Sequence, residues 1–314
     1  MALIWSTIAA IATFSSHSFV APLTVPKGGA SPGRTGGDTP EIASPLSFPS
    51  PSVAKCQAKI LPYSSLRHLN GPVRSLQVEG TGTGSLYYVG VTHTNAPQHP
   101  QFDQIEEDFY RIQPTIVFYE GPERSLPTTR NSAIEKAGDP GLIRYLATQQ
   151  QIPIAPLEPS RQAEINILLE RFTPEQIKLF YVLRQVTELR ERWGTTSKAQ
   201  LQQAVVRSIN QFSGFDGLKT VITDMDDFET SYQKHWQSST NWWQVPQQWF
   251  HPVLTVEETG GIFTNDIHRT ASTFRNQHMA QVIADAVNQG HRVMATVGHS
   301  HLPLQAPALE CLIQ

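Results

Sequence analysis

The segment 275–301 constrains the fold strongly, because it reads as a helix that leads directly into a short buried strand. Apolar residues recur at helical spacing over residues 275–289, and Gly290 supplies a helix stop. Residues 293–297 are mostly apolar and read as a strand that ends at Gly298. A helix that packs on a parallel sheet and feeds the next strand runs antiparallel to that strand. The segment therefore predicts an α/β fold.

The lengths of this helix and strand predict where Arg275 lies. The helix spans about 21 Å and the strand about 20 Å. We therefore expect Arg275 to return to the level of Gly298 and His301. Arg275 also falls on the apolar stripe of the helix, so its side chain should face the sheet. A cation and an imidazole are thus expected at one edge of the sheet, where open α/β folds bind their ligands.

A strand–helix–strand pattern earlier in the chain delivers two more polar side chains to strand ends. Residues 86–91 read as a strand that leads to His93. A helix over residues 102–112 follows, and residues 115–119 read as a second strand that ends at Glu120. The pattern predicts a βαβ unit, in which His93 and Glu120 lie just past the same ends of neighbouring parallel strands.

A third strand and a long helical block come next. Residues 152–157 read as the strand, which places Glu158 at the same edge of the sheet. Residues 160–250 have helical patterns and no strand signal, so they are predicted to form a helical insertion. The insertion leaves the sheet after Glu158 and returns before Arg275, so we expect it to cover the polar edge as a lid.

The residues gathered at this edge are suited to metal chemistry. His93, His301 and the carboxylate of Glu120 are a ligand set for a divalent ion with open positions, such as Mn, Co, Zn or Fe. Such an ion polarises a carbonyl group and lowers the pKa of bound water. Glu158 could then act as general base, and Arg275 could stabilise negative charge in the transition state.

Two alternatives apply to these residues. A histidine at a strand end is often a hydrogen-bonded structural residue rather than a ligand. His299 also competes with His301 for the role of second ligand. The pattern Gly-x-x-His occurs by chance in many chains, but here it occurs twice, at Gly90 to His93 and at Gly298 to His301, both times at a predicted strand end. The presence of two such motifs favours a functional role for His93 and His301 over a purely structural one.

Composition bounds the class of protein. The chain has 314 residues, with 39% hydrophobic and 16% charged residues, which is typical of a globular protein. The net charge of −3 gives no support for a nucleic-acid partner.

The chain has two cysteines, Cys56 and Cys311. Two cysteines are too few for a disulfide scaffold, and their spacing matches no zinc knuckle. They either form one bridge that joins the two ends of the domain in an oxidising compartment, or are unrelated thiols.

The N-terminal region reads as a leader followed by a segment without a core. Residues 2–14 are almost wholly apolar and have the length of a secretory h-region, although the first basic residue is Lys27. Residues 1–21 are therefore expected to be a signal peptide or apolar leader of a secreted, periplasmic or envelope-associated protein. The alternatives are an uncleaved anchor that associates with the membrane, or an organellar transit segment. Residues 22–55 are rich in Pro, Gly and Ser and are predicted to be disordered, which leaves residues 56–314 as the folded domain.

At these residues the chain resembles the TraB/GumN–Tiki family, within the wider erythromycin esterase/ChaN-like group. The resemblance covers residues 87–302. It is carried by the two Gly-x-x-His motifs that end at His93 and His301, by the strand-end Glu120, by the pair Leu157-Glu158, and by Arg275-Asn276 with Met279. The helical middle does not match by residue, and His299 and the long N-terminal segment depart from the pattern.

The resemblance implies a central, largely parallel sheet made of two related halves around a polar cleft, with flanking helices and a helical insertion. Family members resemble metal-dependent hydrolases, and the Tiki branch is similar to metalloproteases that cut peptides. The expected function is thus a metal-dependent hydrolase acting on a peptide or ester-like bond in a peptide or small-molecule substrate. The alternative is a non-catalytic protein that binds haem or a signalling peptide in the same cleft.

Overall fold

The computed structural model describes residues 50–314 apart from residues 69–73, 123–124, 126–127, 195–196 and 238–239. The predicted leader, residues 1–21, and most of the Pro/Gly/Ser-rich segment lie outside the described residues. The described chain forms two compact units. Unit 1 contains residues 50–60, 71–158 and 279–314, and unit 2 contains residues 61–70 and 159–278.

Unit 1 is built on a five-stranded sheet with the order β1-β2-β5-β3-β4. The first strand is antiparallel to its neighbour, and the other four are parallel to one another. This arrangement confirms the predicted α/β class with a largely parallel sheet. The strands are β1 (Ser75–Glu79), β2 (Ser85–Val91), β3 (Ile116–Tyr119), β4 (Ile154–Pro156) and β5 (Arg292–Gly298), and the helices of this unit are α1 (Pro51–Gln57), α2 (Gln101–Ile112), α3 (Arg130–Gln149), the end of α9 (Thr264–Asn288) and α10 (His301–Leu312).

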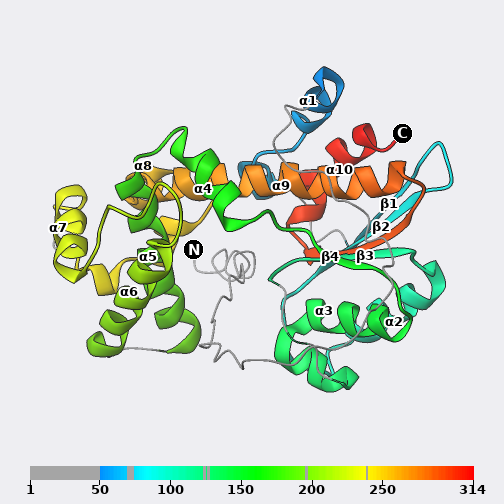
Figure 1. Cartoon of the computed structure of the whole chain (residues 1–314), viewed down its shortest axis with the longest axis horizontal. Coiled ribbons are helices and arrows are strands. Elements are labelled where there is room, and N and C mark those ends of the chain that lie inside the picture. Colours follow the sequence, from blue (N-terminus) through cyan, green and yellow to red (C-terminus); the bar gives the residue numbers. More distant parts are fainter. Residues whose placement is uncertain (1–49, 69–73, 123–124, 126–127, 195–196, 238–239) are drawn as a thin grey trace, which may run out of the picture. The chain divides into compact units, whose positions relative to one another are not determined.

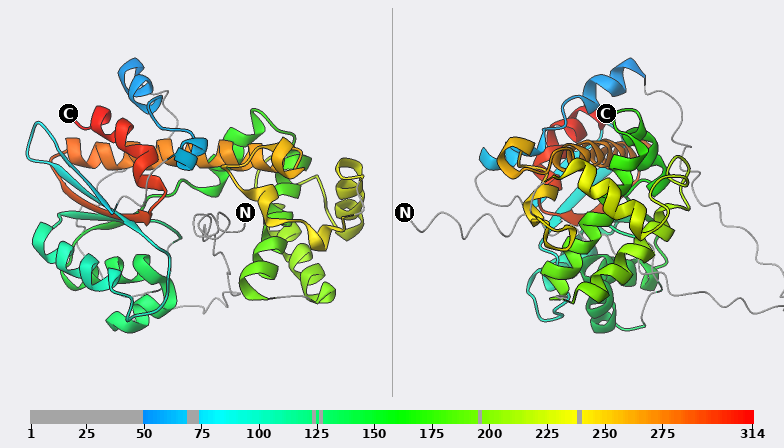
Figure 2. Two further views of the ribbon diagram at one scale, coloured as in Figure 1. Left: turned by 180° about the vertical axis from the view of Figure 1, so that it is seen from behind. Right: turned by 90° about the vertical axis from the view of Figure 1, so that its left-hand side faces the viewer.

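Alternate side chains of each central strand enter opposite cores, because successive residues of a strand point to opposite faces. In β2, Leu86 and Tyr88 pack with α9 and α10, whereas Tyr87 and Val89 pack with α2 and α3. Helices therefore cover both faces of the sheet, as the two views of this unit show (Figures 1 and 2). All three residues from Val117 to Tyr119 are at most 2% exposed, so the sheet is buried on both sides.

The order of the strands corrects one prediction. His93 and Glu120 do not follow neighbouring strands, because β5 lies between β2 and β3 and pairs with both. This order is still compatible with the predicted site. The segment from Gly298 to His301 follows β5 and therefore leaves the sheet between the ends of β2 and β3. The edge strand β1 and the helix α10 were not predicted.

A disulfide joins Cys56 to Cys311, with the two Cα atoms 5.3 Å apart. It connects α1 to α10, and both cysteines contribute to the core that includes Leu309 and Leu312. The first of the two alternatives for the cysteines is thus the one the structure contains. The described structure also begins before Cys56, because α1 starts at Pro51, where Ser50 caps it.

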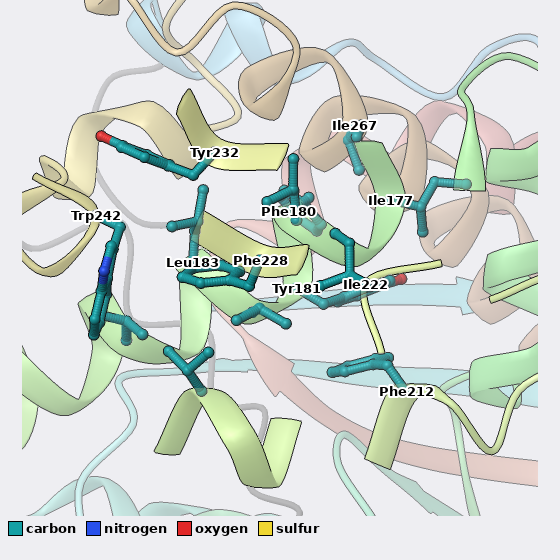
Figure 3. Packing of buried hydrophobic residues seen from close by; sticks show 14 of the residues in the cluster. Ile177, Phe180, Tyr181, Leu183, Phe212, Ile222, Phe228, Tyr232, Trp242 and Ile267 are labelled. Carbon is teal, nitrogen blue, oxygen red and sulfur yellow. The ribbon is translucent and has the colours of Figure 1, made fainter. Parts of the chain in front are cut away.

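Unit 2 is helical, as predicted for residues 160–250, and no strand occurs among its described residues. Thr173 and Gln176 form a capping box at the start of its long helix, with Pro174 in the first turn. Aromatic and aliphatic side chains fill the core, including Phe180, Tyr181 and Trp242 (Figure 3). The helices are α4 (Arg161–Leu169), α5 (Pro174–Trp193), α6 (Lys198–Phe212), α7 (Met225–His235), α8 (Val256–Thr259) and the first part of α9, with short 3₁₀ turns η1 (Tyr63–His68), η2 (Trp242–Gln244) and η3 (Gln247–Phe250).

Unit 2 is larger than the predicted insertion, since it also takes in residues 61–70 and the first half of α9. The expectation that residues 160–250 act as a lid stays a prediction. None of the helices that the structure describes is long and apolar enough to span a bilayer.

Candidate functional site

The carboxylate of Glu120 lies between two imidazoles of unit 1. Its Oε2 is 3.8 Å from Nε2 of His93, and its Oε1 is 3.5 Å from Nε2 of His301. The three side chains come from the carboxyl ends of β3 and β2 and from the first residue of α10, which follows β5. Their exposure falls from 18% for the His93 side chain to 7% for Glu120 and 0% for His301. The structure thus brings together the three residues predicted as metal ligands.

Gly298 makes this close approach possible. Its backbone N–H donates a 2.7 Å hydrogen bond to Oε2 of Glu120, which fixes the carboxylate. A Cβ atom at this position would lie 2.9 Å from Nε2 of His93 and 3.5 Å from Oε2 of Glu120. Only glycine therefore leaves both side chains where they are.

Asp139 orients the imidazole of His93 from the other side. Its Oδ1 is 3.3 Å from Nδ1 of His93, and the residue is 1% exposed. α3 breaks just before this aspartate, where Gly138 has a φ of 63° and lies against the carbonyl oxygen of Thr94. The break allows the carboxylate to reach the loop that carries His93. A carboxylate on the far nitrogen of a histidine is the usual partner of a histidine that binds a metal ion.

Gln305 and Tyr88 hold the second imidazole. The side-chain amide of Gln305 lies 3.4 Å from Nδ1 of His301, one turn earlier on α10. The Tyr88 hydroxyl donates a 3.0 Å hydrogen bond to the amide oxygen of Gln305. All three side chains are fully buried, so the position of His301 is fixed by its packing.

His299 is not part of this group. Its backbone N–H donates to the carbonyl oxygen of Val91 at 3.0 Å, and its Nδ1 lies 3.4 Å from the same oxygen. The peptide of His299 therefore extends the pairing of β5 with β2 by one residue. Of the two competing histidines, it is His301 whose ring faces Glu120.

The remaining predicted residues are placed as follows. Glu158 is half-buried and lies two residues past Pro156, which pairs with Tyr119 in the sheet. It is therefore at the same sheet edge as Glu120, as predicted. Arg275 is 6% exposed on α9 and belongs to unit 2, so its proximity to the histidines stays a prediction.

The donor set suits a divalent ion in its chemistry, and two of its distances can be compared with those of a metal site. Four ligands at 2.0–2.2 Å around a tetrahedral ion lie about 3.4 Å from one another. The two contacts of Glu120 with the imidazoles, 3.5 and 3.8 Å, are within about half an ångström of that value. Among the described residues, however, no group of three or more His, Cys, Asp or Glu side chains is arranged so that it could hold a metal ion, and the ligand set stays a prediction.

Two carboxylates are buried beside the imidazole of His93. Glu120 and Asp139 are both nearly fully buried and both contact His93. Buried carboxylates are costly unless positive charge lies close to them. One cation of unit 1 lies close to this strand end, since the guanidinium of Arg144 is 4.9 Å from the ring centroid of Tyr119, the residue before Glu120.

Comparison with family models, with curated proteins and with solved structures finds no match to this chain. The resemblance to the TraB/GumN–Tiki family thus rests on the sequence motifs themselves.

Sequence reasoning missed Asp139 and Gln305. A signal for the first was present: Gly138, Asp139 and Pro140 interrupt an otherwise helical pattern, which is typical of a break in a helix. No local signal marks Gln305, because its role depends on two residues that only the fold brings to it.

Proposed function

We propose that this protein is a metal-dependent hydrolase of the TraB/GumN–Tiki type, acting on a peptide or ester-like bond. The observation that carries the proposal is the Glu120 carboxylate within 4 Å of Nε2 of both His93 and His301. The proposal includes the finer fold assignment, a sheet made of two related halves with the two Gly-x-x-His loops as corresponding parts. The equivalent exits of β2 and β5 from the sheet support that assignment.

Each residue of the site has a role in this proposal. His93, His301 and Glu120 would hold Mn, Co or Zn, which when bound polarises the scissile carbonyl and acidifies a water molecule. Asp139 keeps the Nε2 atom of His93 directed at the site. Glu158, at the same sheet edge, takes the proton from the attacking water. Arg275, following the sequence expectation, stabilises negative charge on the substrate oxygen.

The alternative of a haem-binding protein fits the surroundings of His93 less well. A haem site needs a flat apolar slot beside its histidine ligand. Here two carboxylates, Glu120 and Asp139, contact the imidazole. A carboxylate within reach of both histidines is what a hydrolytic site requires, which favours the hydrolase.

The disulfide supports an extracytoplasmic location. Bridges such as Cys56–Cys311 form and persist in oxidising compartments. Together with the apolar leader, the disulfide supports the proposal that the protein is secreted, periplasmic or envelope-associated.

Metal titration of the melting temperature tests the proposed site. An ion that binds only the folded protein stabilises it by about 2.7 kcal/mol at a hundredfold excess over the Kd. We expect Mn, Co or Zn to raise the melting temperature of the wild type and a chelator to lower it. His93→Ala and His301→Ala should each abolish the response, because each removes one ligand. Hydrolysis of peptide and ester substrates by the metal-loaded protein, measured in parallel, identifies the bond class.

His299→Ala is the matched control, since His299 lies on the same loop and does not face Glu120. This variant should keep most of the metal response. Equal responses in the wild type and in both ligand variants would show that the histidines are structural, and the proposal would then fail.

A further inference from the structure

The side-chain amide of Gln305 lies between a hydroxyl group and an imidazole. The Tyr88 hydroxyl donates a 3.0 Å hydrogen bond to the amide oxygen. The amide nitrogen lies 3.6 Å from the sulfur of Met279 and 3.4 Å from Nδ1 of His301. All four residues are fully buried, and all four belong to unit 1. The orientation of this amide therefore decides what Nδ1 of His301 meets.

The neighbours of the amide select its orientation. A thioether sulfur has no hydrogen to donate, so Met279 can only accept. The Tyr88 hydroxyl has a single hydrogen, which it donates to the amide oxygen. The NH₂ group of Gln305 is thus the end that faces Met279 and His301. Because that group is a donor only, Nδ1 of His301 must accept and carries no hydrogen.

Glu120 favours the same state of the imidazole from the opposite side. In a neutral imidazole one nitrogen carries the hydrogen and the other accepts. With Nδ1 as the acceptor, the hydrogen of His301 is on Nε2, which is 3.5 Å from Oε1 of Glu120. An N–H group is favourable beside a carboxylate, whereas a lone pair there would be repelled. Both neighbours of the ring therefore select the same tautomer.

The imidazole of His93 is prepared in the opposite way. Its Nδ1 is 3.3 Å from Oδ1 of Asp139, and a carboxylate oxygen is an acceptor. The hydrogen of His93 is thus held on Nδ1, which leaves the lone pair on Nε2 that a metal ligand needs. The two histidines that face Glu120 therefore differ: His93 presents a lone pair to the site, and His301 presents an N–H group.

We propose that Gln305 is a positioning residue that holds the hydrogen of His301 on Nε2, so that His301 can act as a metal ligand only when the amide of Gln305 turns over. The inference rests on the proposed function, in which His301 is a ligand. As a ligand, Nε2 gives up its hydrogen, and the hydrogen on Nδ1 then needs an acceptor. A half-turn of the amide supplies its oxygen to Nδ1 and its NH₂ group to the oxygen of Tyr88, which can accept.

This half-turn has a cost that sets the affinity of the site. It places the amide oxygen of Gln305 against the sulfur of Met279, and two acceptors that face each other gain no hydrogen bond. A carboxylate at the same position would need no turn, because one oxygen accepts from Tyr88 and the other accepts from Nδ1 of His301. Gln305 is therefore expected to weaken metal binding relative to glutamate.

Nitrogen NMR of the metal-free full chain tests the tautomer directly. The histidines are labelled with ¹⁵N, metal is removed with a chelator, and spectra are recorded at alkaline pH, where ¹⁵N shifts distinguish the two neutral tautomers. The signal of His301 is identified by its absence from the spectrum of His301→Ala. We expect the hydrogen of His301 on Nε2 in the wild type.

Gln305→Glu tests the positioning role, since glutamate has nearly the same shape as glutamine. The hydrogen of His301 should move to Nδ1, and the apparent Kd for Zn²⁺ should fall about tenfold or more, as for other changes of the partner of a ligand histidine. Gln104→Glu, at an exposed glutamine of α2 in the same unit, adds the same charge and is the matched control. It should change neither the tautomer nor the affinity.

Three results would overturn the inference. The first is a wild type whose His301 carries its hydrogen on Nδ1, a result that does not require any variant of Gln305 to fold. The second is a folded Gln305→Glu protein whose ring keeps its hydrogen on Nε2. The third is an unchanged affinity for Zn²⁺ in Gln305→Glu when the wild type binds this ion. Failure of the proposed function looks different: the hydrogen moves as expected, which supports the control of His301 by Gln305, but neither protein binds Zn²⁺.

Discussion

At the scale of single residues, Gly298 leaves no room for a methyl group between the imidazole of His93 and the carboxylate of Glu120. We expect Gly298→Ala to fold, with a loss of about 1–3 kcal/mol in the free energy of unfolding from overpacking. The displaced His93 ring should also reduce the metal-dependent rise in melting temperature to near zero. Thermal unfolding with and without metal measures both effects.

Gly82→Ala serves as the control for this substitution, because a Cβ atom at Gly82 meets nothing within 4 Å. Its stability and metal response should match those of the wild type. An unchanged metal response in Gly298→Ala would mean that the ion, if it binds, binds elsewhere.

The sequence could predict the residues that follow strands but not those that support them. His93, Glu120 and His301 were found because buried strands are short apolar runs, and polar residues just past them share one edge of a parallel sheet. Asp139 reaches His93 across a sequence separation of 46 residues, through a break in α3. No periodic pattern encodes a contact of that kind, which forms only when two elements dock.

At the scale of elements, the disulfide between Cys56 and Cys311 fixes α1 on α10. Reduction, or the double substitution Cys56→Ala with Cys311→Ala, should leave a folded protein that has lost about 2–5 kcal/mol of the free energy of unfolding. The reason is that the bridge restricts the unfolded chain over a separation of 255 residues. Chemical denaturation with and without reductant measures the loss.

The double variant is its own control, since reductant should not change its stability further. Two titratable thiols in the native, unreduced protein would contradict the bridge.

A second tie between elements predicts a response to acid. Arg67 of η1 donates to both carboxylate oxygens of Glu258 in α8, and this hydrogen bonding lowers the pKa of Glu258 to about 2. Because the folded pKa lies below the unfolded value of 4.5, the pair stabilises the fold above that pH. The stabilisation is lost as the pH falls through about 2.

Glu258→Gln should therefore melt below the wild type at pH 7, and the difference should shrink as the pH falls from about 5 to 2. Melting curves across this range measure it. Glu170→Gln, at an exposed glutamate of the same unit, is the control and should show no such convergence. A difference that stays constant with pH would argue against the pairing.

The elements themselves were partly predictable. Four of the five strands of the sheet appear in the sequence as apolar runs, and for β2, β3 and β5 the reason is that both of their faces are buried. The fifth, β1, is an edge strand of five residues in which Leu76 and Val78 alternate with polar residues, a weaker signal. The order of the strands was not predictable, since the apolar sequence of residues 293–297 does not indicate which strands β5 pairs with.

At the scale of the whole molecule, the N-terminal segment is predicted to contribute nothing to the folded domain. Its Pro, Gly and Ser content cannot bury enough apolar surface to order it. Removal of residues 1–49 should leave the melting temperature unchanged. Removal of residues 1–57 should lower it, because that deletion also takes α1 and Cys56. A drop of several degrees on the shorter deletion would contradict the prediction.

The place of β5 in the sheet has a consequence for synthesis on the ribosome. Of the five described strands, the one that joins β2 to β3 is translated last. Until it leaves the exit tunnel, the strands that carry His93 and Glu120 have no shared neighbour, whereas unit 2 is already complete at residue 278. Pairings between segments so distant in the chain also form slowly. A stop codon before residue 292 thus abolishes the sheet and the candidate site together, and a nascent chain cannot assemble the candidate site before β5 has been translated.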